Sequence, residues 1–159
     1  AVVVGHIHGY GKNMKIYIQP DPLNLRIPFP VQMEMIKSVI ATQKNQFHHR
    51  VKIYVEDVAY QKVVVQVLES GRYDVVGVPT GKSDKSARLR LATPFIKSGQ
   101  VLFPETGCEE LIMQLVGFGK EKHDDLADAF AMLVLKAVEE NPRCGSAGVS
   151  ANGIRFDAI

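Results

Sequence analysis

The sequence predicts an α/β fold built as a single domain. An apolar run at residues 51–55, an amphipathic segment at 58–71 and a second apolar run at 73–79 form a strand–helix–strand unit. Such a unit gives two parallel neighbouring strands joined by a right-handed crossover. The chain has 159 residues, of which 46% are hydrophobic and 23% are charged, so one domain can bury a core of its own.

The first part of the chain predicts a hairpin, a connector and a helix. AVVVG at residues 1–5 and KIYIQ at 15–19 are short β-branched runs around a glycine-containing loop, which indicates two antiparallel strands. PDPLNLRIPFP at 20–30 contains four prolines, so it is a connector rather than a regular element. From Pro30 to about Phe47, apolar residues recur at helical spacing.

The strand–helix–strand unit follows. VKIYV at 51–55 is apolar without alternation, which predicts a central strand buried on both faces. The helix at 58–71 ends at Gly71 and carries its apolar stripe on Tyr60, Val63, Val64, Val67 and Leu68. Pro79 ends the second strand of the unit.

Further elements are predicted in the second half. A helix lies around 86–95, a short strand at 100–104 and an amphipathic helix at 108–118, whose apolar residues are Leu111, Ile112, Leu115 and Val116. The last helix runs from about Asp124 to Glu140 and stops before Asn141 and Pro142.

The predicted domain spans residues 1–141, and the small, polar, glycine-containing segment 142–159 is predicted to be a flexible C-terminal tail. The longest apolar run, Ala129–Leu135, is far shorter than the ~20 residues of a membrane-spanning helix. Cys108 and Cys144 stand alone without metal-ligand spacing. This pattern fits a reducing compartment better than a disulfide scaffold, and it argues against a zinc site.

One segment of the chain is strongly basic. The whole sequence has a net charge of +2, but residues 82–97 contain five Lys or Arg residues against Asp84 alone, a local balance of +4. Such a segment can bind a nucleic-acid backbone through charge, independently of base sequence. A solvated helix face is the alternative interpretation.

Acidic residues gather at two places. Glu56 and Asp57 directly follow the strand at 51–55, and the carboxyl ends of parallel strands form the ligand-binding edge of such sheets. Asp124, Asp125 and Asp128 are spaced three and four residues apart, so they lie together at the start of the last helix.

Helix capping is one explanation of the second cluster, because Asp124 or Asp125 can accept hydrogen bonds from free backbone N–H groups. Asp128 is harder to explain in that way, because AFAMLVL directly after it is apolar on every side and predicts a buried helix. Carboxylates from both clusters would repel one another unless a cation neutralised them. Mg²⁺ or Mn²⁺ prefers such oxygen ligands, and a pair of these ions suits phosphodiester cleavage.

Four segments, in this order, resemble the C-terminal nuclease domain of the large terminase subunit of tailed double-stranded DNA viruses: VEDVAYQKVVVQVL, VVGVPTGKSDKSARL, FIKSGQVLFP and FGKEKHDDLADAF. The resemblance covers roughly residues 1–140. It implies a ribonuclease H-like fold, with a mixed β-sheet flanked by helices on both faces. It also implies a metal-dependent endonuclease that cuts concatemeric double-stranded DNA by two-metal phosphodiester hydrolysis.

The resemblance also implies a set of site residues. Glu56 matches the acid at the end of the central strand, and Asp124 and Asp125 match the acidic pair that opens the last helix; these three are the expected catalytic residues. The expected ligands of the Mg²⁺ or Mn²⁺ ions are Glu56, Asp124, Asp125 and Asp128. The expected DNA contacts on the basic segment are Lys82, Lys85 and Arg88.

In this family the first metal-binding Asp lies on a strand upstream of the hairpin. The domain is therefore expected to be N-terminally truncated, without that strand and that acid, which leaves the activity of this chain alone in question. The resemblance implies a viral portal, a small terminase subunit and an N-terminal ATPase domain as partners besides DNA, with no membrane, in the host cytoplasm during virus assembly. Two alternatives stay open: another ribonuclease H-like nuclease or resolvase, and a catalytically incomplete DNA-binding or assembly module.

Overall fold

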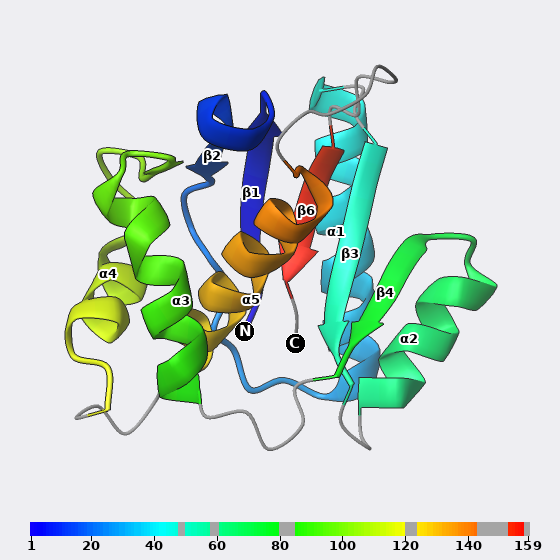
Figure 1. Cartoon of the computed structure of the whole chain (residues 1–159). Helices are drawn as coiled ribbons and strands as arrows, with labels where there is room; N and C mark the ends of the chain where they lie inside the picture. Colours follow the sequence, from blue (N-terminus) through cyan, green and yellow to red (C-terminus); the bar gives the residue numbers. More distant parts are fainter. Residues whose placement is uncertain (48–49, 58–60, 80–84, 120–123, 143–152, 158–159) are drawn as a thin grey trace.

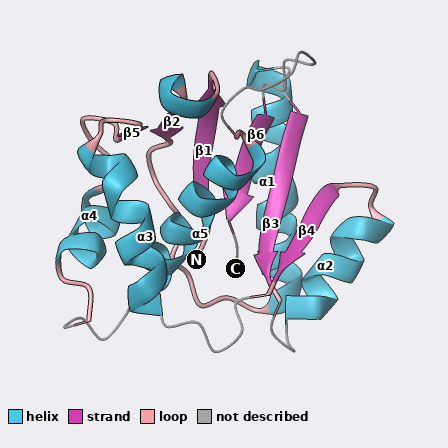
Figure 2. Ribbon diagram, in the orientation of Figure 1, coloured by secondary structure: helices cyan, strands magenta, loops and turns pink. Residues whose placement is uncertain are grey.

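We describe a computed structural model of the chain, in which residues 1–47, 50–57, 61–79, 85–119, 124–142 and 153–157 are placed, the last of these segments by its backbone only. The described part forms one mixed sheet of six strands with helices on both faces (Figure 2). In sheet order the strands are β4 (Asp74–Val78), β3 (Arg50–Glu56), β6 (Gly153–Asp157), β1 (Val3–His8), β2 (Lys15–Ile18) and β5 (Val101–Leu102).

The predicted strand pairings are confirmed. β1 and β2 form the antiparallel hairpin, and β3 and β4 are parallel neighbours. A 3-10 helix, η1 (Gly11–Asn13), lies within the hairpin connection, and β5 extends the sheet in parallel with β2. The central position predicted for β3 also holds, because β3 lies between β4 and β6.

Residues 153–157 differ from the expectation that 142–159 form a flexible tail. They form β6, which lies inside the sheet, antiparallel to β1 and parallel to β3. The physical reason is hydrogen bonding: without β6, the facing edges of β1 and β3 would present rows of unpaired backbone groups. Asp157 lies in register with Tyr54, so β6 ends at the same edge of the sheet as β3.

Two layers of helices enclose the sheet (Figure 1). One face is covered by α1 (Phe29–Phe47) and α2 (Gln61–Ser70), and the other by α5 (Asp125–Glu140), against which α3 (Lys85–Lys97) and α4 (Glu109–Val116) pack. α5 is buried on most of its surface, as its apolar sequence predicts. Among the described residues, none of the helices is long and apolar enough to cross a membrane.

The alternation of side chains along β3 decides which face each residue serves. Val51, Ile53 and Val55 pack into the core shared with α1 and α2. Tyr54 packs on the opposite face, against Met132 of α5. Because side chains alternate along a strand, Glu56 lies on the same face as Tyr54 and is directed toward α5.

α5 runs antiparallel to β3. At the far end of the helix, Glu140 accepts hydrogen bonds from Tyr54 and, at 2.8 Å, from the Lys52 ammonium. The first turn of α5 therefore lies beside the carboxyl end of β3. This packing brings together two acidic clusters that are far apart in the sequence.

α4 buries only part of the apolar face that the sequence predicts: Leu115 packs, partly buried, against the same core as Leu111. Leu111 is buried, but Val116 is 85% exposed and Ile112 is also exposed. Gln114 is buried in their place, because the short helix contacts α5 through the face that carries Leu111 and Gln114.

Candidate active site

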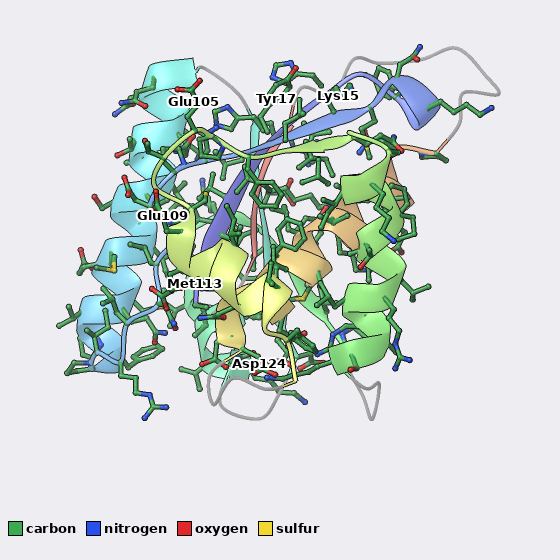
Figure 3. The ribbon with its side chains drawn as sticks, turned by 90° about the vertical axis from the view of Figure 1, so that its left-hand side faces the viewer. Lys15, Tyr17, Glu105, Glu109, Met113 and Asp124 are labelled. Carbon is green, nitrogen blue, oxygen red and sulfur yellow. The ribbon has the colours of Figure 1, made fainter. Side chains whose placement is uncertain are left out.

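A hollow of about 260 Å³ lies where β3 ends and α5 begins. Its charged lining comes from four segments: the connector after the hairpin, the end of β3, the start of α3 and the start of α5. The charged side chains are Arg26, Glu56, Lys85, Asp125 and Asp128. Asp124 lies at this end of the molecule as well (Figure 3).

The two adjacent acids at the end of β3 have different surroundings. Glu56 lines the hollow. Asp57 is exposed, and its carboxylate lies 3.8 Å from the Lys62 ammonium, outside the set that lines the hollow. The structure therefore separates the pair into one acid that faces α5 and one that faces solvent.

Asp128 lies in the first turn of α5 and is almost enclosed. The Arg88 guanidinium donates to both carboxylate oxygens, through Nη2 at 2.6 and 2.8 Å and through Nε at 2.9 Å. The side chains of Arg88 and Asp128 are only 11% and 13% exposed. Burial raises the pKa of the Asp128 carboxyl, Arg88 opposes that change, and the charge of Glu56 adds to it.

Lys85 occupies the remaining side of the acidic cluster. Its ammonium donates a hydrogen bond to Oδ1 of Asp124 at 2.9 Å and lies 3.9 Å from Oδ1 of Asp125. Burial alone would lower the pKa of Lys85, but the hydrogen bond to Asp124 and the charges of the three aspartates raise it overall. Two cations of α3, Lys85 and Arg88, therefore form ion pairs with carboxylates of the acidic cluster.

Capping of α5 is done by a residue that the sequence does not indicate. Oε1 of Gln114, on α4, accepts hydrogen bonds from the backbone N–H groups of Leu126 at 2.9 Å and Ala127 at 3.3 Å. Asp124 stands at the N-cap position, yet its side chain makes no capping hydrogen bond. The capping explanation of Asp124 is therefore wrong, and this carboxylate pairs with Lys85 instead.

The structure thus brings all four predicted ligands, Glu56, Asp124, Asp125 and Asp128, to one end of the molecule. It also shows two of the three predicted DNA contacts facing these acids, since Lys85 pairs with Asp124 and Arg88 with Asp128. Lys82 lies outside the described residues. Metal binding and DNA contact stay predictions for all of these residues.

Comparison with protein families decides what kind of domain this is. A family model described as a terminase RNaseH-like domain matches residues 12–137, most of the chain. The chain belongs to the terminase RNaseH-like domain family. The comparison with curated proteins and the comparison with solved structures gave no match. The family match confirms the resemblance and the ribonuclease H-like fold class, and the matched range includes all four carboxylates.

The donor chemistry of this terminase RNaseH-like domain fits a hard divalent cation, because the hollow presents carboxylate oxygens from β3 and α5. Among the residues that the structure describes, no group of three or more His, Cys, Asp or Glu side chains converges as a ligand set. Asp124 and Asp128 are held instead by Lys85 and Arg88. The oxygen ligands that a hard divalent cation prefers are therefore present. In this structure the ammonium of Lys85 and the guanidinium of Arg88 pair with two of these carboxylates.

Proposed function

We propose that this terminase RNaseH-like domain is a divalent-cation-dependent endonuclease that cuts concatemeric double-stranded viral DNA. The observation that supports this most directly is the meeting of Glu56, from the end of β3, with the acids at the start of α5 around one hollow. Membership of a terminase family supports a nuclease-type module, and the carboxylates around the hollow support the proposal that a divalent cation binds there.

The residues that would hold Mg²⁺ or Mn²⁺ are Glu56, Asp124, Asp125 and Asp128. Together they would hold two ions in a two-metal site. Such ions, when bound, supply an activated water and stabilise the leaving oxygen of a phosphodiester. The chain supplies orientation: Arg88 fixes the Asp128 carboxylate through both oxygens, and Gln114 fixes the first turn of α5. Arg26 and Lys85 add positive charge beside the hollow, which favours a phosphate backbone.

The same proposal includes partners. A packaging nuclease of this family would act with a viral portal, a small terminase subunit and an N-terminal ATPase domain, in the host cytoplasm during virus assembly. Arg90 of α3, which is exposed, adds positive charge outside the hollow.

The test compares the two neighbouring acids of β3. Nicking of supercoiled plasmid is followed in Mn²⁺ for the unmodified protein, for Glu56→Gln and for the matched control Asp57→Asn. We expect Glu56→Gln to lose at least ~100-fold in rate, since a metal-ligand carboxylate acts in the chemical step, and Asp57→Asn to stay within about threefold. Equal loss in both variants, or in neither, would refute the assignment of the site to Glu56.

A second candidate, a DNA-binding or assembly module without activity, is favoured by one observation: Lys85 and Arg88 already pair with two of the four acids, Asp124 and Asp128. This candidate predicts that no divalent cation supports plasmid nicking. It also predicts that the affinity for duplex DNA falls steeply with salt concentration and does not change when Mn²⁺ is added. Parallel assays on branched DNA and on an RNA–DNA hybrid separate the packaging nuclease from other ribonuclease H-like activities.

A further inference from the structure

The two cations that pair with Asp124 and Asp128 are held in different ways. Arg88 makes a forked contact with both oxygens of Asp128, and both side chains are nearly buried. Lys85 is 42% exposed and reaches Asp124 with its ammonium at 2.9 Å. Lys85 also lines the hollow, together with Glu56 and Asp125, whereas Arg88 does not.

These differences predict different lifetimes for the two pairs. An enclosed, forked Arg–carboxylate pair is strong and costly to break, because each charge would be left without its partner away from water. A half-exposed Lys–carboxylate pair contributes little and exchanges readily, since the ammonium is a compact charge on a flexible stem. A cation entering the hollow would therefore compete with Lys85 and leave the Arg88 pair in place.

We propose that Lys85 is an exchangeable counter-ion of the acidic hollow. It pairs with Asp124 when the hollow holds no divalent cation, and it is displaced when a cation binds the carboxylates. As the first residue of α3, at the rim of the hollow, the released ammonium then contacts a phosphate of the DNA backbone. Cation binding and DNA binding are thereby coupled through one side chain. This inference rests on the proposed function of the site.

The first test is calorimetric titration of Mn²⁺ into the unmodified protein, Lys85→Gln and the control Lys97→Gln. Lys97 lies on the same helix, about 18 Å further along its axis, and is exposed. Removing a competing half-exposed pair should tighten Mn²⁺ binding by about fivefold in Lys85→Gln. Lys97→Gln should bind Mn²⁺ as the unmodified protein does.

A second readout follows the other half of the exchange. The affinity for a fluorescent DNA duplex is measured by anisotropy, with and without Ca²⁺ as an oxygen-preferring cation. The unmodified protein should bind the duplex more tightly when Ca²⁺ is present, and Lys85→Gln should lose most of that gain. Thermal unfolding of each variant confirms that Lys85→Gln is folded.

The outcomes separate the inference from the proposed function. If the unmodified protein binds Mn²⁺ and Lys85→Gln binds it no more tightly, Lys85 does not compete and the inference is overturned while the nuclease proposal stands. Equal tightening in Lys97→Gln would also overturn it, because the effect would then be one of overall charge. If the unmodified protein binds no Mn²⁺, the proposed function itself fails.

Discussion

Replacing Gln114 by Leu tests how the first turn of α5 is held. Gln114 is buried, and its Oε1 accepts from the N–H groups of Leu126 and Ala127. Leucine has a similar volume but no acceptor, so the variant keeps the packing and removes the cap. α5 should then fray at the end that carries the acidic cluster.

The size of the effect follows from the two hydrogen bonds. A buried donor left without its acceptor costs about 1–3 kcal/mol, and loss of an N-cap typically costs about 1 kcal/mol. The contact with Ala127 is long, at 3.3 Å, so the bond to Leu126 dominates. We expect Gln114→Leu to lower the free energy of unfolding by about 2 kcal/mol, which corresponds to about 4–8 °C in Tm for a chain of this size.

The matched comparison is Asp124→Ala, which removes any side-chain acceptor at the N-cap position. The Asp124 side chain makes no capping hydrogen bond and only a partly exposed ion pair, so this variant should lose less than about 1 kcal/mol. Urea unfolding measures both free energies, and amide hydrogen exchange at Leu126 and Ala127 reports fraying directly. If Asp124→Ala costs more than Gln114→Leu, the side chain of Asp124 caps the helix, which would contradict the assignment of the cap to Gln114.

Three further outcomes follow from the structure. Arg88→Gln should cost about 2–4 kcal/mol at neutral pH, because it leaves Asp128 enclosed and unpaired. Burial already raises the pKa of Asp128, so ionisation of this carboxyl destabilises the fold as pH rises. The loss of unfolding free energy in Arg88→Gln, measured by urea unfolding, should therefore be smaller at pH 5 than at pH 7.5. A loss that does not depend on pH would contradict this. Deletion of residues 143–159 should accelerate amide exchange in β1 and β3, both of which pair with β6, and unchanged exchange would exclude β6 from the sheet. Burial raises the pKa of the Cys108 thiol, so alkylation at pH 8, followed by peptide mapping, should be slow until the protein unfolds; rapid labelling of the native protein would contradict this.

Local patterns in the sequence predicted much of the fold. The unbroken apolar run of β3 indicated a buried central strand, and the all-round apolar character of α5 indicated a buried helix, because burial on every side leaves no polar stripe. These two elements carry Glu56 and Asp125, which the structure brings to one hollow.

The remaining features depend on contacts between distant residues. Gln114 looks like a polar surface residue of an amphipathic helix, and only the packing of α4 on α5 makes it a cap. Arg88 pairs with Asp128, which is 40 positions further along the chain. The sequence predicts that Arg88 contacts DNA, whereas in the structure its side chain faces this nearly enclosed carboxylate. Residues 153–157, GIRFD, alternate apolar and polar residues as a strand does, but this short pattern follows a small, glycine-containing segment, and its place in the sheet depends on the facing edges of β1 and β3.

The most direct test of the site is binding of Mn²⁺, measured by calorimetry without DNA, to the unmodified protein, Glu56→Gln and Asp57→Asn. We expect clear binding by the unmodified protein, at least tenfold weaker binding by Glu56→Gln, and unchanged binding by Asp57→Asn, because of these two acids only Glu56 lines the hollow with the acids of α5. Equal affinity of Glu56→Gln and the unmodified protein would contradict the claim that this hollow is the cation site.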